Sequence, residues 1–328
     1  MFERFRGRHV LLLQGPLGPF FRYFARDLEA HGAKVTKLAF NAGDALYYLG
    51  TPYRAYRGTL EAWPDFFEAF CTKHEVDTVF LLGDMRPYHR PIASAVAAHG
   101  IDLFVFEEGY LRPNFITLES GGVNGNSRMP KDAASYVDAG LDPKSDEVQA
   151  QRVFGKSAIL TSLYYVAYNF FCFLYPFYRH HRDSNALKHG LSWVRSGLRK
   201  LRFRYEEDGI LEDLRTTYQQ RYFFVPLQVW NDFQWKHSPF QDTDELLEYI
   251  ISSFAAHADP EHRLVVKHHI ADRGYRDYTA LIDEKRRRFG LGERLIYVHD
   301  LHLPTLLQHA RGTVVMNSTV GLSSLHHG

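Results

Sequence analysis

The sequence predicts an α/β protein with two parallel-sheet domains joined by a helical segment. Apolar runs of strand length alternate with amphipathic runs of helix length, which is typical of strands connected by crossover helices. The alternation occurs twice, before residue 110 and again after residue 220. A chain of 328 residues is also long enough to bury two separate cores. We therefore expect an N-terminal domain over residues 1–150, a helical segment over 151–215 and a C-terminal domain over 216–328.

The first domain is expected to run β-α-β-α-β-α-β. The apolar runs that predict its strands cover residues 9–15, 34–40, 76–83 and 102–109, and helices are expected near 19–31, 60–74 and 88–99. The loop QGPLGPFF that follows the first strand matches neither a GxGxxG nor a Walker motif. Its two prolines remove backbone N–H donors, so it is either a substrate-shaping turn or a plain strand-to-helix turn.

The pattern returns in the second domain. Its expected strands cover residues 222–229, 263–270, 294–300 and 312–318, and its helices lie near 243–257, 275–288 and 303–310. A further helix is expected after residue 319, and the sequence stops inside it, so we expect a truncated C-terminus. Two such domains are expected to face each other across a cleft at the carboxyl ends of their strands, where open α/β sheets bind ligands.

Composition and charge exclude several function classes. The 39 Lys and Arg residues nearly balance the 38 Asp and Glu residues, which argues against a general nucleic-acid binder. Cys71 and Cys172 are isolated and match no metal-binding spacing, and the N-terminus lacks the pattern of a signal peptide. We expect a cytoplasmic protein with no nucleic-acid partner.

Residues 157–178 carry no charge, which meets the minimum length for a membrane-spanning helix. Asn169, Pro176 and five tyrosines make the segment less apolar than a typical span. Three alternatives stay open: a span, a buried or semi-buried helix, and a helix at a membrane surface.

Residues 179–204 are strongly basic, with eight Lys and Arg against one acid, Asp183. Apolar residues at near-helical spacing accompany them, so the segment is either a solvated face or an amphipathic helix that meets anionic lipid. The candidate lipid contacts are Arg195, Arg199, Lys200 and Arg202.

Polar residues follow two neighbouring strands of the first domain. Glu107 and Glu108 end the strand at 102–109, with Arg112 shortly after them. Paired acids push each other's pKa values apart, which suits general acid/base chemistry, although one of them could instead cap a loop or pair with Arg112. The strand before it is followed by three more candidate ligands, Asp84, Arg86 and His89.

The second domain places a carboxylate and a cationic group after its first two strands. Asp232 is positioned to attack a sugar's anomeric carbon or to stabilise a cationic transition state. Lys267, His268 and His269 suit a phosphate leaving group. A zinc site competes with that interpretation, but adjacent histidines on a strand point in opposite directions.

The residues 317–319 open a helix, where backbone N–H groups, hydroxyls and the helix dipole favour a phosphate; an ordinary N-cap is the alternative. The triplet DTD at 242–244 looks like a metal-binding motif of some sugar transferases, but it opens an amphipathic helix and is better explained as an N-cap.

Together, LLLQGPLGPFF, GDMRPYHR, FEEGYLRP, FFVPLQVWNDFQ, KHH and NSTVGL resemble the capsule polysaccharide biosynthesis family, in its KpsS-type β-Kdo transferase branch. The resemblance covers residues 8–328. It implies a GT-B fold of two Rossmann-like domains and a retaining glycosyltransferase. The donor is then CMP-Kdo and the acceptor a phosphatidylglycerol-type lipid, on which the capsule linker begins.

The resemblance also implies site residues. Asp232 matches the nucleophile, Glu108 or Glu107 the acid/base group, and no metal or cofactor is expected. The implied substrate-binding residues are Asp84, Arg86, His89, Arg112, Gln228, Lys267, His268, His269, Asn317, Ser318 and Thr319. The implied partners are an anionic lipid, the inner face of the cytoplasmic membrane, and other capsule assembly and export proteins.

Three other functions compete with that of a β-Kdo transferase. A GT-B enzyme that uses a UDP-sugar would differ in its nucleotide, and a non-catalytic capsule assembly or export factor would only hold lipid-linked glycan. A nicotinamide enzyme is disfavoured because the glycine fingerprint is missing.

Overall fold

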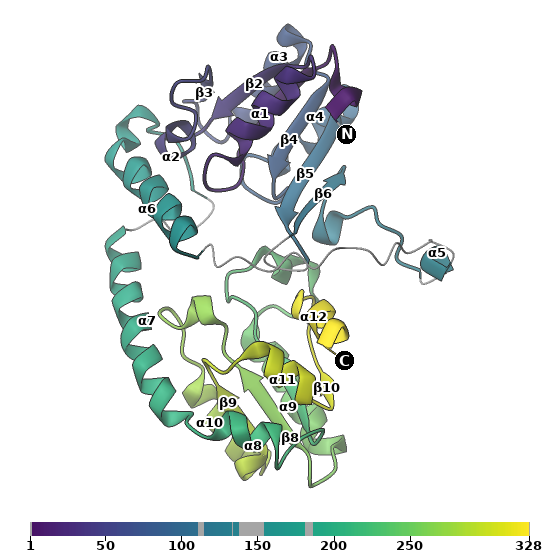
Figure 1. Cartoon of the computed structure of the whole chain (residues 1–328), viewed down its shortest axis with the longest axis vertical. Coiled ribbons are helices and arrows are strands. Elements are labelled where there is room, and N and C mark those ends of the chain that lie inside the picture. Colours follow the sequence, from purple (N-terminus) through teal and green to yellow (C-terminus); the bar gives the residue numbers. More distant parts are fainter. Residues whose placement is uncertain (1, 111–114, 133, 138–153, 181–185, 328) are drawn as a thin grey trace. The chain divides into compact units, whose positions relative to one another are not determined.

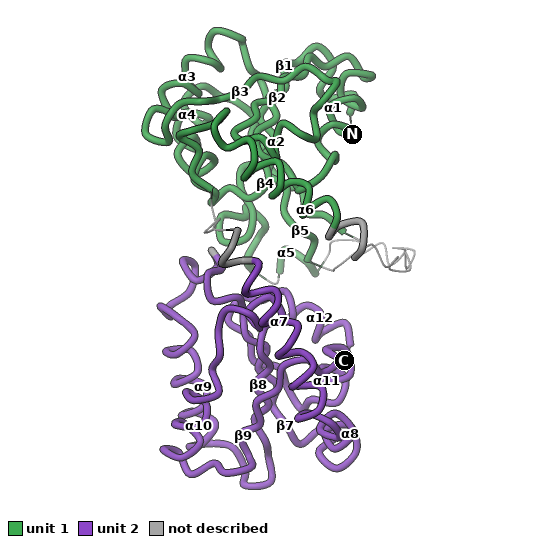
Figure 2. Tube along the Cα trace, turned by 90° about the vertical axis from the view of Figure 1, so that its left-hand side faces the viewer, with its two compact units in different colours: residues 1–186 green, residues 187–328 purple. Residues whose placement is uncertain are grey.

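The computed structural model describes residues 2–110, 115–132, 134–137, 154–180 and 186–327 (Figure 1). The chain forms two compact units, unit 1 (Met1–Ala186) and unit 2 (Leu187–Gly328) (Figure 2). Each unit contains a sheet that is wholly or mainly parallel and carries helices, so the predicted mixed α/β class with two parallel-rich sheets is confirmed.

The sheet of unit 1 has the order β3-β2-β1-β4-β5-β6. Its strands are parallel except for β6, which is antiparallel to β5. The strands are β1 (His9–Leu12), β2 (Lys34–Ala39), β3 (Arg54–Ala55), β4 (Thr78–Leu82), β5 (Asp102–Glu108) and β6 (Ile116–Ser120). The strand order reverses between β1 and β4, which places a switch point of the Rossmann type beside them.

Helices cover both faces of this sheet because the side chains of each strand alternate between its faces. Phe24 and Leu28 of one helix pack with Val10, whereas Trp63 of another packs with Leu11 on the opposite face. The helices of unit 1 are α1 (Phe20–Ala30), α2 (Ala42–Leu46), α3 (Trp63–His74), α4 (Ala93–Ala98), α5 (Ala134–Val137) and α6 (Phe154–Phe170).

Helix α6 packs on α2 at close range. A Cβ atom added at Gly43 would lie 2.7 Å from the carbonyl oxygen of Tyr164, so glycine allows the two helices to approach. Asn41 Nδ2 donates a hydrogen bond to the Tyr164 hydroxyl at 3.0 Å. The buried face of α6 therefore holds Tyr164 and Ala167. Among the described residues, no helix combines the length and the apolar character that a membrane crossing requires.

The sheet of unit 2 is wholly parallel, with the order β10-β7-β8-β9. Its strands are β7 (Tyr222–Pro226), β8 (Arg263–Lys267), β9 (Leu295–Val298) and β10 (Gly312–Thr313). The helices are α7 (Ala186–Glu206), α8 (Ile210–Arg215), α9 (Thr243–His257), α10 (Thr279–Arg288), α11 (Leu303–His309) and α12 (Val320–His327). Asp242 accepts hydrogen bonds from the N–H groups of Asp244 and Glu245, so the predicted N-cap of α9 is confirmed.

The core of unit 2 also has two faces. Leu247 and Ile251 of α9 pack with Val266 on one face, and Leu306 of α11 packs with Val265 on the other. Helix α7 runs along one side of the unit (Figure 1). The boundary between the units falls inside the helical segment expected at 151–215, because α6 belongs to unit 1 and nearly all of α7 to unit 2.

Candidate functional site

Four strand ends meet at one edge of the unit 2 sheet, because its strands are parallel. β7 and β10 adjoin where the strand order reverses, which is where open α/β sheets bind ligands. Each strand is followed by polar residues: Gln228 and Asp232 after β7, residues 267–269 at the end of β8, His299 and Asp300 after β9, and Asn317, Ser318 and Thr319 after β10. We call this set the unit 2 edge site.

A short chain of amide hydrogen bonds crosses the switch point. Gln228 Nε2 donates to Asn317 Oδ1 at 2.8 Å, and Asn317 Nδ2 donates to the carbonyl oxygen of Gln234 at 3.0 Å. Gln228 is buried, and its Oε1 finds no hydrogen-bond partner among the described residues. The predicted residues Gln228 and Asn317 are therefore in contact, with one buried acceptor left over.

Asp232 lies at the start of a 3-10 turn and is half-buried. Its Oδ1 accepts a hydrogen bond from the N–H of Gln234 at 3.0 Å, which fixes the side chain beside the switch point. A second carboxyl group, Asp272, lies near enough to feel its charge. Asp272 is buried and accepts a hydrogen bond from the N–H of Trp230 at 2.8 Å.

Burial raises the pKa of Asp272 to about 6, and the charge of Asp232 adds to that rise. Asp272 Oδ1 has no hydrogen-bond partner among the described residues. Asp272 is not among the site residues predicted from the sequence, although it stands only three residues after the KHH motif.

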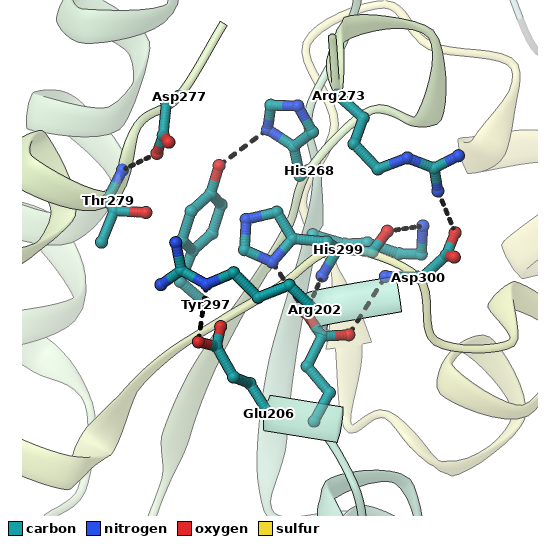
Figure 3. Close-up of polar contacts among 11 residues, drawn as sticks. Arg202, Glu206, His268, Arg273, Asp277, Thr279, Tyr297, His299 and Asp300 are labelled. Atoms are coloured by element: carbon teal, nitrogen blue, oxygen red, sulfur yellow. Dashed lines mark hydrogen bonds and ion pairs between the residues drawn. The ribbon is translucent and has the colours of Figure 1, made fainter. Parts of the chain in front are cut away.

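The two histidines after β8 differ in environment. His268 is buried, its Nδ1 lies 2.7 Å from the Tyr297 hydroxyl (Figure 3), and burial lowers its pKa to about 3, which keeps the ring neutral. His269 is less buried, and its Nδ1 accepts a hydrogen bond from the N–H of Ala271 at 3.2 Å. A neutral ring that accepts at Nδ1 carries its proton on Nε2, so His269 has a donor suited to an anion.

Lys267 contributes the cation of this group. Its Nζ donates to the carbonyl oxygen of His299 at 3.0 Å, and burial lowers the pKa of the ammonium. This contact ties the end of β8 to the end of β9.

A buried carboxylate braces the end of β9. Glu207 accepts hydrogen bonds from the backbone N–H of His299 at 2.6 Å and of Asp300 at 3.1 Å, and it lies 2.7 Å from His299 Nδ1. Arg273 pairs with Asp300 at 2.7 Å (Figure 3). Glu207, His299, Arg273 and Asp300 are not among the site residues predicted from the sequence. The one signal for them was the polar pair His299–Asp300 at the end of a predicted strand.

The start of α12 has ordinary capping geometry. Ser318 Oγ accepts a hydrogen bond from the N–H of Val320 at 3.3 Å, and Thr319 directly precedes the helix. This hydrogen bond supports the N-cap alternative. The phosphate contact at residues 317–319 stays a prediction.

In unit 1, Glu107 and Glu108 are the last two residues of β5. Glu107 is half-buried; its Oε1 accepts from the N–H of Glu108 at 3.0 Å and its Oε2 from Asn124 Nδ2 at 3.4 Å. Glu108 is exposed. Asp84 accepts hydrogen bonds from the N–H of Val123 and from Asn126 Nδ2, both at 3.1 Å, so it holds the loop that follows β6.

Three further basic residues of unit 1 are buried or partly buried. Lys37, which was not predicted as a site residue, is buried, donates to the carbonyl oxygen of Leu13 at 2.5 Å and pairs with Asp44 at 3.1 Å. Arg86 is partly buried, and burial lowers its pKa despite the charge of Glu107. His89 lies 2.8 Å from the carbonyl oxygen of Gly83, and burial lowers its pKa to about 3. The predicted ligand Arg112 lies outside the described residues.

The candidate lipid contacts on α7 fall into two groups. Arg195 and Lys200 are exposed. Arg199 instead donates to the carbonyl oxygens of Arg273 and Arg276, each at 2.8 Å, and pairs with an aspartate, while Arg202 pairs with Glu206 at 2.7 Å. Across the described residues, no cluster of three or more His, Cys, Asp or Glu side chains is arranged to hold a metal ion.

Comparisons with known proteins give a consistent result. The profile of the family described as "Capsule polysaccharide biosynthesis protein" matches residues 77–328. The chain is 38% identical over 323 residues to the capsule polysaccharide export protein KpsS of Escherichia coli, covering 98% of this chain and 83% of that relative. It is 37% identical over 328 residues to the capsule polysaccharide modification protein LipB of two Neisseria meningitidis strains, of serogroups A and B, covering 97% of this chain and 78% of each relative.

Proposed function

The chain belongs to the capsule polysaccharide biosynthesis protein family, and from this premise we propose that it is a retaining β-Kdo transferase with a GT-B fold. The proposed reaction moves Kdo from CMP-Kdo to a phosphatidylglycerol-type lipid. One observation carries the proposal: a carboxylate, a lysine, a donor histidine and a helix start follow the strands at one edge of a single parallel sheet. A nucleotide-sugar transferase that proceeds through a covalent adduct needs these groups.

In the proposed first step, a carboxylate oxygen of Asp232 attacks the anomeric carbon of Kdo. The bond from that carbon to the phosphate oxygen breaks, and CMP leaves with the electron pair. Lys267, His269 and the N–H groups at the start of α12 stabilise the phosphate that departs.

In the second step, a hydroxyl of the lipid attacks the adduct and displaces Asp232, which regenerates the carboxylate. The proton of that hydroxyl passes to a base, a role that the proposal assigns to Glu107 or Glu108 in unit 1. Two inversions at one carbon give net retention.

The test compares Asp232→Asn with the native protein. Loss of the nucleophile should reduce Kdo transfer by at least roughly 10³-fold, while CMP binding persists because the phosphate contacts remain. Transfer is measured by mass spectrometry with CMP-Kdo and a lysophosphatidylglycerol analogue, and binding by titration with CMP. Asp213→Asn, an exposed carboxylate on α8, is the matched control and should leave both unchanged.

Two outcomes would contradict the proposal. Full transfer by Asp232→Asn would remove this residue from the mechanism. Binding of UDP in preference to CMP would favour the rival enzyme that uses a UDP-sugar.

A second candidate is a non-catalytic capsule assembly or export factor, favoured by the word "export" in the name of the Escherichia coli relative. This candidate predicts that CMP-Kdo is not consumed with any lipid acceptor, although the chain still binds a lipid-linked glycan.

We also propose a peripheral position at the inner face of the cytoplasmic membrane. Helix α7 supports it, because a row of exposed apolar residues runs along the helix among its basic residues: Leu191, Val194, Leu198, Leu201 and Tyr205. Such a face suits the interface of an anionic bilayer.

A further inference from the structure

Unit 1 contains a pocket whose lining includes none of the candidate site residues named above. Its volume is about 300 Å³, at the small end of the range for ligand sites. It lies between the start of α2 and the last turn of α6 with the residues that follow it, and half of its lining residues are aromatic: Asn41, Ala42, Tyr168, Cys172, Phe173, Tyr175, Pro176 and Tyr178. This lining offers apolar surface with a few hydroxyl and amide groups.

The outer face of the same segment is apolar and exposed. Ile159, Leu163, Val166 and Phe170 are spaced by four, three and four residues, so they form one stripe along α6. The segment after the helix continues it with Phe171, Phe173, Leu174 and Phe177, all exposed. Contiguous apolar surface of this kind marks an interaction site, and a helix whose other face packs on protein can present it to a bilayer.

Phe173 connects the two features. It lines the pocket and is also 66% exposed, so the pocket opens beside the exposed apolar surface. A lipid lying against that surface therefore has a short route into the pocket.

Basic residues flank the pocket. The guanidinium of exposed Arg57 lies 6.0 Å from the centre of the Tyr175 ring. Arg86 interacts electrostatically with Tyr178, whose hydroxyl accepts a hydrogen bond from Gln14 Nε2 at 2.9 Å. The nearby carboxylate Asp44 is paired with Lys37. The charge around the pocket thus complements an anionic headgroup, and the stripe complements acyl chains.

We infer that this pocket binds part of an anionic glycerophospholipid drawn from a bilayer on which the apolar face of α6 rests. The inference depends on the proposed function for the role of that lipid as acceptor, and it adds the place where unit 1 holds it. The headgroup phosphate lies by Arg57, and the apolar portion contacts Phe173 and Tyr175.

The chain offers its own reporter for the test. Cys172 lines the pocket and is exposed, whereas Cys71 is buried and burial raises the pKa of its thiol to about 12. A water-soluble maleimide should therefore label Cys172 and spare Cys71. The protein is incubated with vesicles of phosphatidylglycerol mixed with phosphatidylcholine, or of phosphatidylcholine alone, and the rate of labelling is followed by mass spectrometry.

The anionic vesicles should slow labelling of Cys172 several-fold, and phosphatidylcholine vesicles should slow it much less. Phe173→Ser should weaken binding to the anionic vesicles by roughly tenfold or more. Tyr249→Ser, which changes an exposed aromatic residue of α9 in unit 2, is the matched control and should bind as the native chain does. Arg57→Glu should remove the preference for the anionic lipid.

Equal labelling rates with and without anionic vesicles would overturn the inference, and this measurement needs no variant to fold. Equal protection by both vesicle types would overturn the headgroup contact. Consumption of CMP-Kdo with a detergent-dispersed acceptor is measured separately, so failure of the lipid pocket and failure of the proposed enzyme give different results.

Discussion

Ionisation of the buried carboxyl group of Asp272 costs the fold free energy at neutral pH. It is 1% exposed, and burial raises its pKa from 3.8 to about 6, with a smaller contribution from Asp232. A folded-state pKa above the unfolded value means that the native state binds the proton more tightly. The resulting stabilisation is present below pH 3.8 and is lost as the pH rises through about 6.

We predict that Asp272→Asn removes this pH dependence. The free energy of unfolding of the native protein, relative to the variant, should fall by about 2 kcal/mol between about pH 4 and pH 7. Asparagine keeps an acceptor for the N–H of Trp230. Urea unfolding of both proteins across this range measures the difference, and parallel curves would show that Asp272 ionises normally.

The free energy of unfolding must be compared between the native protein and the variant at each pH, because His89 and His268 change it with pH in the opposite direction. Burial lowers the pKa of each to about 3, so their contribution to stability grows as the pH rises toward 6.5. Both histidines remain in the variant, and their effect is therefore common to the two curves.

At the scale of elements, Gly274 determines how closely α7 packs on the rest of unit 2. A Cβ atom added at Gly274 would lie 2.2 Å from the carbonyl oxygen of Ser192 in α7. The backbone of the helix must then move, since no side chain can rotate away. The helix is anchored further along by Phe203, whose ring stacks on His299 with 3.5 Å between the ring centres.

We predict that Gly274→Ala displaces α7 and lowers the stability of unit 2 by roughly 1–3 kcal/mol. Hydrogen exchange of the α7 amides should accelerate, and the urea midpoint should fall. Gly197→Ala is the matched control within α7, where an added Cβ meets nothing within 4 Å. It should stabilise the helix by about 0.5–1 kcal/mol, so equal effects of the two substitutions would contradict the close approach.

The elements also show what the sequence could and could not predict. Apolar runs located the central strands of both sheets, because a buried parallel strand must be almost continuously apolar. They overestimated strand length: β7 ends at Pro226, whereas the prediction ran to 229. The edge strands β3 and β6 were not predicted, because β3 has only two residues and β6 is only half-buried and therefore has no continuous apolar run.

The same limit applies to the site. Residues that follow a strand, such as Asp232 and His269, could be placed at one edge of the sheet from the sequence, because strand ends at one edge meet in any parallel sheet. Glu207 was missed because it lies 92 residues from His299 in sequence, and only the docking of α7 brings them together. The sequence contained a signal for Lys37, because a lysine inside an apolar strand needs a partner when it is buried. That partner is Asp44.

At the scale of the whole molecule, the formal net charge is +1, so the chain as a whole is not drawn to anionic surfaces. Attraction to an anionic bilayer must come from a local arrangement of charge, and α7 has one. Arg195 and Lys200 are exposed beside its apolar row. Arg199 instead donates a hydrogen bond to the carbonyl oxygen of Arg273, so it is unsuitable for a test of lipid contact.

We predict that the double variant Arg195→Glu with Lys200→Glu binds phosphatidylglycerol vesicles at least roughly tenfold more weakly than the native chain, since each basic residue near such a surface contributes about 1 kcal/mol. The matched control reverses two exposed arginines of unit 2 outside α7, Arg221 and Arg287. The net charge of both double variants falls from +1 to −3, because each reversal replaces one positive charge with one negative charge. Vesicle co-sedimentation at low and high salt measures binding, and the difference between the variants should shrink as salt screens the charges. If both variants lose binding equally, net charge explains the effect and α7 is only a solvated face; if neither does, the basic residues of α7 do not contact lipid.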